Sequence, residues 1–180
     1  MAKMIRIFRG AAIAIGAMSL MSGAAFAQDQ STNRVAAKTD WSAFVEDNPT
    51  ECWGVATPKE TVNTREGRVV AATRGQILLM VFYRPSAGAQ GQVAFTGGYP
   101  FRSGSTVNVN ISGNEFELFT EGEWAWPATV ADDAKIVTAM KRGADAVVTG
   151  ISSRGTTTKD TFSLLGFTAA VEDAEGHCGG

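Results

Sequence analysis

Few residues of this 180-residue chain could carry out catalysis. His177 is the single histidine, and it lies in a glycine-rich tail where the base of a nucleophilic triad would be hard to hold rigid. One histidine and two cysteines leave mostly carboxylates as metal ligands, and no Asp-x-Asp-x-Asn-Gly calcium loop occurs. We therefore predict a non-enzymatic protein with no catalytic residues, metal or cofactor, with calcium at a chance carboxylate cluster as the weaker alternative.

Paired acids beside paired tryptophans form the pattern closest to a site. Glu121 and Glu123 could act as the two carboxylates of glycoside hydrolysis. Trp124 and Trp126, two positions apart, would share one face of a strand and offer a flat platform for a sugar ring. We favour a simpler interpretation, in which a glutamate-rich turn leads into a strand whose tryptophans pack inward. A carbohydrate-binding, or weakly carbohydrate-active, domain is the alternative.

A second aromatic group lies in the loop Gly97-Gly98-Tyr99-Pro100-Phe101. Its rings could contact a partner, or they could close one end of the fold, which is the interpretation we favour. Tyr99 and Phe101, together with Trp124 and Trp126, make up the candidate contact surface that the sequence predicts.

The first 27 residues predict a cleaved signal peptide. Three basic residues occur in the first nine positions, an apolar run follows at 11–21, and Ala25-Phe26-Ala27 offers small residues where a signal peptidase cuts. The apolar run is shorter than the roughly 20 residues that a membrane-spanning helix needs. We expect cleavage after Ala27, a periplasmic or secreted location, and no integral membrane segment in the mature chain.

Export changes how the two cysteines are interpreted. Cys52 and Cys178 both lie in the exported part, and in an oxidising compartment an even count predicts one disulfide. Closing so long a loop contributes roughly 2–5 kcal/mol to stability. A reactive thiol pair is the alternative, but it would call for a Cys-x-x-Cys spacing or a basic neighbour, for which His177 is the sole hint.

Charge and length limit the function classes further. Without the three basic leader residues, the mature chain has 13 basic against 18 acidic residues, a net charge of −5. Such a chain attracts neither nucleic acid nor an anionic membrane. Residues 28–39 are polar and without period, which predicts a flexible linker, and residues 40–180 are long enough for a single domain.

Short β-rich runs separated by turn residues recur about every ten positions, which predicts an all-β, antiparallel, jelly-roll-like sandwich. The apolar run 77–83 indicates a strand covered on both faces. A hairpin is predicted where apolar and polar residues alternate strictly over 106–111. The turn Ser112-Gly113-Asn114 follows, and a second β-rich run occupies 115–120. The other predicted strands are 41–45, 52–57, 68–73, 92–96, 146–152 and 161–171, with Gly166 as a bulge or bend.

A single segment departs from the period of two. Over 131–142 apolar residues recur at three- and four-residue intervals, acids lie at the start and bases at the end, and Gly143 follows. We predict one short amphipathic helix that lies on the sandwich. The tail from Asp173 is charged and glycine-rich, and we expect its Cys178 to be held by the disulfide.

The order of these motifs resembles the invasion-associated locus B family of exported alphaproteobacterial proteins. The resemblance covers roughly 41–178 and rests on Cys52-Trp53 before the long apolar strand, Gly98-Tyr99-Pro100-Phe101, Ile136-x-x-Ala139-Met140-x-x-Gly143, Ser153-Arg154-Gly155-Thr156, and Asp160-x-Phe162-Ser163-Leu164-x-Gly166-Phe167-Thr168-Ala169-Ala170. It implies a compact β-sandwich with one helix and a near-terminal cysteine partner, which supports pairing of Cys52 with Cys178. No catalytic residues carry over, and an early extra cysteine of some relatives has no counterpart near Trp41.

The family takes its name from members linked to host-cell invasion. The resemblance and the scarcity of catalytic groups together predict an exported, non-enzymatic accessory protein of the cell envelope, acting in host-cell or envelope interaction. Its expected partner is a protein or an envelope glycan, and no nucleic acid. The carbohydrate-binding β-sandwich stays the alternative.

Overall fold

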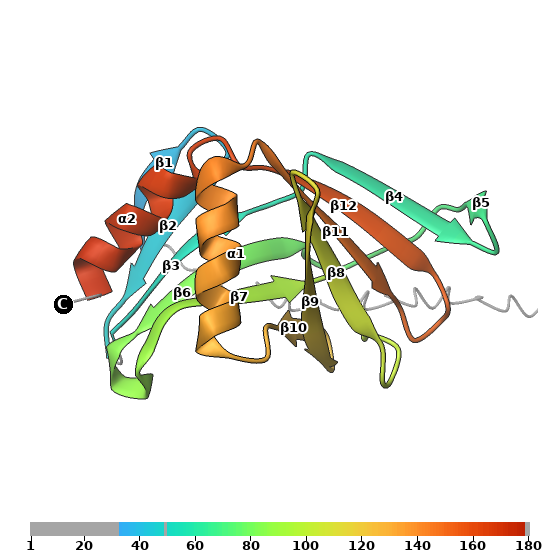
Figure 1. Cartoon of the computed structure of the whole chain (residues 1–180), viewed down its shortest axis with the longest axis horizontal. Coiled ribbons are helices and arrows are strands. Elements are labelled where there is room, and N and C mark those ends of the chain that lie inside the picture. The colour runs from blue at the N-terminus through green and yellow to red at the C-terminus, as the bar shows by residue number, and fades with distance from the viewer. Residues whose placement is uncertain (1–32, 49, 179–180) are drawn as a thin grey trace, which may run out of the picture. The chain divides into compact units, whose positions relative to one another are not determined.

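The computed structural model describes residues 33–48 and 50–178, which form one antiparallel sheet of twelve strands with two α-helices (Figure 1). The strands are β1 (Arg34–Lys38), β2 (Trp41–Glu46), β3 (Glu51–Ala56), β4 (Glu60–Arg65), β5 (Arg68–Val69), β6 (Leu78–Arg84), β7 (Ala89–Thr96), β8 (Thr106–Ile111), β9 (Asn114–Glu121), β10 (Trp124–Trp126), β11 (Asp145–Ile151) and β12 (Thr157–Ser163). The helices are α1 (Val130–Arg142) and α2 (Phe167–Cys178), and a 3-10 turn, η1 (Pro85–Ala87), joins β6 to β7. This architecture confirms the predicted all-β class.

The sandwich is made by two halves of a single sheet. The strand order is β1-β2-β3-β6-β7-β10-β9-β8-β11-β12-β4-β5, and every neighbouring pair is antiparallel. The chain passes directly from β3 in the first half to β4 in the second half, and the Lys59 amide donates to the Thr161 carbonyl at this crossing. Inward-facing side chains of both halves share one core with α1 and α2.

Alternation of side chains accounts for the second half. Val107, Val109 and Ile111 of β8 are buried, and the β8–β9 hairpin pairs Thr106 with Phe119 and Ile111 with Asn114. Its two-residue turn has positive φ at both positions, 51° at Ser112 and 86° at Gly113, as a type I′ turn requires. The predicted hairpin is therefore confirmed.

Helix α1 begins and ends where its sequence signals indicate. The Thr129 side chain accepts a hydrogen bond from the Asp132 amide, and Ile136 and Met140 are buried. Asp133 is also buried, and its Oδ1 accepts from the Val93 amide at 2.8 Å, which attaches α1 to β7. Burial raises the pKa of this carboxyl, against the lowering effect of that hydrogen bond.

A second helix replaces the second part of the predicted final strand and continues through the tail. The buried residues of α2 recur at three- and four-residue intervals, so they lie on one face of the helix: Phe167, Ala170, Val171, Ala174 and Cys178. Gly166 precedes it at φ 89°, and a Cβ there would lie 1.8 Å from the Lys38 carbonyl oxygen. The predicted bend is therefore correct at Gly166, but the strand ends at Ser163 because the chain must turn there to cover the core.

The predicted linker 28–39 is wrong over Arg34–Lys38, which form edge strand β1 against β2. The main chain supplies this pairing, while the side chains bury little: Val35 is 46% exposed and Ala36 is half-buried. Residues 28–32 and the predicted signal peptide 1–27 with Ala27 lie outside the described residues. Within the described part of the chain, no helix is both long and apolar enough to cross a membrane.

A disulfide joins Cys52 of β3 to Cys178 at the end of α2, with a Cα–Cα distance of 5.8 Å and 126 positions between them. Both residues are buried. Trp41 holds the same region: its Nε1 donates to the Ser163 carbonyl at 2.9 Å, and its ring meets Phe167 edge-on at 4.8 Å. Helix α2 is thus attached to the first half of the sheet at both of its ends.

We expect the double variant Cys52→Ala/Cys178→Ala to lose about 2–5 kcal/mol of unfolding free energy, because its unfolded chain is no longer restrained by the cross-link. Urea unfolding of the oxidised mature chain and of the variant measures this difference. Thiol-reduced wild type is the matched control and should unfold like the variant. An unchanged midpoint after full reduction would contradict the prediction.

Candidate functional site

A cavity of about 450 Å³ lies where five segments distant in sequence converge. Its walls come from the end of β4, from 71–74 before β6, from 98–100 after β7, from Glu123 between β9 and β10, and from 152–158 at the turn from β11 into β12. Two of these segments belong to motifs that carried the family resemblance, Gly-Tyr-Pro-Phe and Ser-Arg-Gly-Thr. Its volume is within the roughly 300–1,000 Å³ of small-molecule sites.

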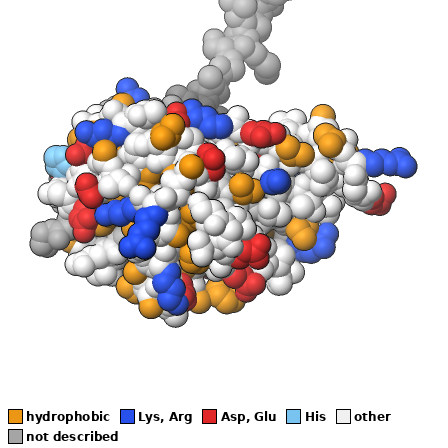
Figure 2. All heavy atoms as spheres, turned by 45° about the horizontal axis from the view of Figure 1, so that its top comes forward, with side chains coloured by type: hydrophobic (Ala, Val, Ile, Leu, Met, Phe, Trp, Pro, Cys, Tyr) orange, Lys and Arg blue, Asp and Glu red, His pale blue; other side chains and the backbone are white. Residues whose placement is uncertain are grey.

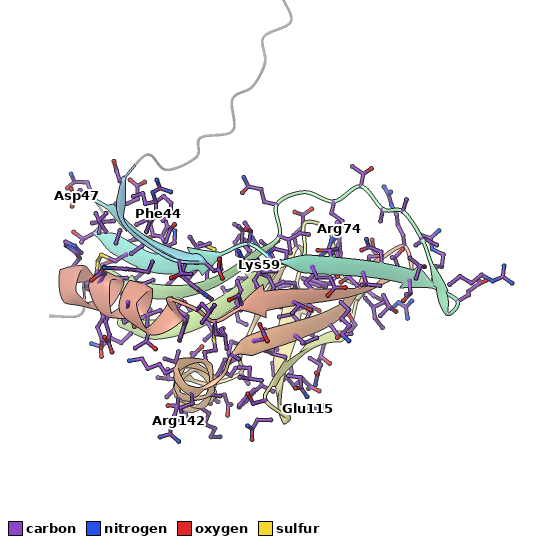
Figure 3. The ribbon with its side chains drawn as sticks, turned by 90° about the horizontal axis from the view of Figure 1, so that it is seen from above. Phe44, Asp47, Lys59, Arg74, Glu115 and Arg142 are labelled. Atoms are coloured by element: carbon purple, nitrogen blue, oxygen red, sulfur yellow. A yellow bond between two sulfur atoms is a disulfide. The ribbon has the colours of Figure 1, made fainter. Side chains whose placement is uncertain are left out.

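A buried ion pair lies behind this cavity. The Arg74 guanidinium donates to both carboxylate oxygens of Asp160, Nη1 to Oδ1 at 2.7 Å and Nη2 to Oδ2 at 2.6 Å. The side chains are 5% and 0% exposed. Arg74 Nε also donates to the Gly97 carbonyl at 2.8 Å, so one side chain joins the 71–74 segment to β12 and to the end of β7. Arg74 belongs to the long connection from β5 to β6, where Figure 3 labels it.

The loop after β7 packs tightly against this pair. Gly98 has φ 70°, and a Cβ there would lie 2.7 Å from the backbone of Gly75, whose amide donates to the Gly98 carbonyl at 2.8 Å. Only glycine allows this approach. The Arg74 guanidinium lies over the Tyr99 ring, with its Cζ 5.0 Å from the ring centroid. The Tyr99 hydroxyl is 2.6 Å from Thr158 Oγ1.

A more open cavity of about 520 Å³ lies between α1 and the β8–β9 hairpin. Phe116, Ala139 and the stem of Arg142 are among its lining residues. We regard it as the weaker candidate because it is more open and its walls are mostly apolar, although polar side chains such as Lys135, Thr138 and Arg142 also line it; the cavity at Tyr99 is more enclosed and mostly polar.

The first half of the sheet carries an aromatic surface on the side away from the helices. Phe44, Trp53 and Phe82 form a row across β2, β3 and β6, with centroids 5.6 and 6.1 Å apart. Figure 3 shows Phe44 on the side opposite α1 and α2. We call this surface the aromatic face; its members are Phe44, Trp53, Val55, Leu78, Met80, Phe82, Ala94, Trp124 and Trp126.

The aromatic face includes both tryptophans of the predicted contact surface. In β10 Ala125 is fully buried in the core, while Trp124 and Trp126 are half-buried on the aromatic face. The prediction that these tryptophans pack inward is therefore wrong, because the pleat places Ala125 inward. Their rings are nearly parallel, at 20°, with centroids 6.3 Å apart.

The four predicted contact residues thus do not form one surface. Tyr99 lines the cavity, whereas Phe101 is 6% exposed in the core, near Phe95 and Tyr99. Phe101 thus packs into the core instead of contributing to an exposed contact surface. The predicted acid pair is also divided: Glu123 lines the cavity, and Glu121 pairs in register with Trp124.

Other predicted groups are placed as follows. His177 is exposed in the last turn of α2, beside a cysteine whose sulfur is oxidised. Among residues 33–48 and 50–178, no group of three His, Cys, Asp or Glu side chains could hold a metal ion.

The Arg74–Asp160 pair was not predicted from the sequence. Asp160 alternates with inward-facing Thr158 and Phe162, and an acid at such a position indicates a buried partner.

The fold and these surfaces define a disulfide-closed antiparallel β protein with a polar cavity and an aromatic sheet face. The chain belongs to the invasion associated locus B (IalB) protein family, whose pattern matches residues 41–175. Its fold is similar to the crystal structure of invasion associated protein B from Bartonella henselae, with a TM-score of 0.54, 14% identity, and coverage of 78% of this chain and 95% of that one. A comparison with curated proteins gave no significant match.

Single substitutions in the buried pair should be costly and strongly coupled. We expect Arg74→Met and Asp160→Asn each to lower the unfolding free energy by about 3–5 kcal/mol, because each leaves an uncompensated buried group. The double variant should lose much less than the sum. Urea unfolding of the four proteins gives this coupling, and additive losses would argue that the ion pair is not formed.

Both tyrosines of the chain should resist ionisation. Burial, with Glu175 and Glu172 nearby, raises the pKa of Tyr83 to about 12, and burial also raises the pKa of Tyr99. Because both folded-state pKa values exceed the unfolded value of about 10, the stabilising contributions are complete below pH 10 and are lost as the pH rises through each folded-state pKa, which for Tyr83 is about 12. Ultraviolet titration should show little phenolate at pH 10; half-ionisation there in folded protein would refute this.

Proposed function

We propose that this chain is an exported, non-enzymatic interaction protein of the cell envelope, and that its aromatic face binds an envelope glycan. Membership of the IalB family, the leader-like N-terminal sequence and the cross-link between Cys52 and Cys178 support export. The family does not supply a ligand, so the choice of a glycan rests on the aromatic face.

The observation that carries this proposal is the Trp124–Trp126 pair. The two indoles are nearly parallel, half-buried and fixed on one strand, so the part of their apolar area that stays exposed is already ordered before binding. The C–H face of a pyranose ring packs on the electron-rich face of such rings. A flexible side chain of equal area would lose more entropy on binding.

Polar groups border the tryptophan pair on β9. Glu121 lies opposite Trp124 in the β9–β10 register, and Phe119, which is 55% exposed, lies opposite Trp126. A carboxylate beside a stacked ring can accept hydrogen bonds from sugar hydroxyls. Toward β3 and β6 the face ends at Arg84, whose guanidinium lies over Phe82 and forms an ion pair with Glu51. The aromatic face therefore has an apolar centre and polar margins, which suit a ligand that presents both C–H and hydroxyl groups.

Binding should depend on the two indoles separately from the fold. We expect peptidoglycan fragments or envelope polysaccharide to shift tryptophan emission saturably, and Trp124→Ala or Trp126→Ala to weaken binding about tenfold or more, as for a central contact residue. Trp126→Phe should retain most of the affinity because it keeps a flat ring. Circular dichroism and urea unfolding should show that all three variants fold.

Two results would contradict the proposal. Unchanged glycan affinity in both alanine variants would show that the Trp124–Trp126 pair is not part of the binding site. Capture of a saturable protein partner from the envelope fraction, with loss of that partner in the same variants and no glycan binding, would make the aromatic face a protein interface instead.

A further inference from the structure

We propose that the cavity beside Tyr99 binds an anionic sugar, a hydroxyl-rich ring that carries a carboxylate or phosphate group, through Arg65 and Arg154. This inference concerns a different part of the molecule from the aromatic face and holds whatever covers that face. It rests on the charges, hydroxyl groups and rigidity of the cavity walls.

The cavity has an excess of positive charge that the fold itself does not use. Of its three arginines, Arg74 is neutralised by Asp160. Arg65 donates only to a neutral hydroxyl, Thr156 Oγ1 at 2.8 Å, and Arg154 is exposed; in the described part of the chain neither is paired with a carboxylate. A guanidinium presents a planar fork of donors that matches a carboxylate or a phosphate.

Figure 2 shows a basic side chain that projects from the tip formed by β4 and β5, with an acidic side chain close to it. The mature chain as a whole is acidic, with 13 basic against 18 acidic residues. A long polyanion would therefore be repelled over most of the surface, while a compact anionic group could enter the local excess of positive charge. This contrast favours a small charged unit over nucleic acid.

Hydroxyl and amide groups line the rest of the cavity. Asn63, Ser152, Ser153, Thr156 and Thr158 are among the lining residues. Thr156 Oγ1 accepts from Arg65, Ser152 Oγ accepts from the Thr156 amide and Thr158 Oγ1 bonds to the Tyr99 hydroxyl, so a ligand would share these groups with the fold, whereas Ser153 is exposed. Glu123, the one carboxylate among the lining residues, can accept from a ring hydroxyl but would repel a second anionic group. A ligand with one charge and several hydroxyls fits this set better than an apolar molecule or a simple inorganic ion.

The arginines are mounted on rigid backbone. Arg65 ends β4, which pairs with β12 through Thr64 and Thr157. Arg154 lies in a turn closed by bonds from the Ser152 amide to the Thr156 carbonyl, from the Thr156 amide to Ser152 Oγ, and from the Gly155 amide to the Ser152 carbonyl. Because the backbone of this site is already ordered, ligand binding costs little conformational entropy in these loops.

Titration of the mature protein with monosaccharides tests the inference. Glucuronate and glucose 6-phosphate should shift the amide NMR signals of 98–99 and 152–156 saturably, and glucose should bind at least tenfold more weakly. Arg65→Gln/Arg154→Gln should weaken binding of the anionic sugars at least tenfold. Arg68→Gln, an exposed arginine on β5 outside the cavity, is the matched control and should not change it.

The arms of this experiment distinguish the sources of charge. Binding of glucuronate alone assigns a carboxylate sugar, and binding of glucose 6-phosphate alone assigns a phosphorylated one; either supports the inference. Equal binding of glucose, binding that survives Arg65→Gln/Arg154→Gln, or equal binding of acetate and inorganic phosphate would overturn it. Trp124→Ala should leave these titrations unchanged, so failure here and failure of glycan binding at the aromatic face are separable.

Discussion

The buried pair of Arg74 and Asp160 is the interaction on which the rest of the architecture depends. A fully buried carboxylate must be compensated, and the guanidinium supplies two short charge-assisted hydrogen bonds. The third donor of Arg74 binds the Gly97 carbonyl, so the pair joins the two halves of the sheet and fixes the loop that carries Tyr99. Together with the bonds from the Val70 amide to the Asn63 carbonyl and from the Gly75 amide to the Gly98 carbonyl, the pair holds the connection from β5 to β6 beside the cavity.

This pair and the disulfide act at different ends of the domain. Cys52 and Cys178 attach α2 to β3, so the helices cover the inner side of the first half of the sheet. The second half of the sheet covers the remainder of the core, while Met80, Phe82 and Ala94 form the buried centre of the aromatic face. Because β6 is apolar on both sides, the sheet has a core on one side and the half-buried aromatic face on the other.

Local sequence signals predicted the parts of the fold whose cause is local. The β8–β9 hairpin follows from alternation and turn residues, and α1 follows from its cap and its period. Helix α2 was missed because Thr168 and Val171 favour strands, whereas its burial pattern appears only when α2 packs against β2 and β3. Strand β1 was missed because its stabilisation comes from backbone pairing. In both segments tertiary contacts override propensity.

The candidate site was predictable only in part for the same reason. Tryptophans two apart indicate a shared strand face, but which face is inward depends on the register with β7 and β9. The cavity joins segments separated by up to about ninety positions, and no local pattern connects Arg74 with Asp160, 86 positions away. The sequence supplied the motifs, and only the topology brings two of them to one cavity.

The most direct test of this account is the NMR behaviour of the Arg74 guanidinium in the mature protein. Two short bonds to Asp160 in a buried site should slow rotation and hydrogen exchange, so that its Nη protons give separate, protected signals at neutral pH. Averaged, rapidly exchanging signals like those of exposed Arg68 would show that the pair is not fixed, and the account would fail.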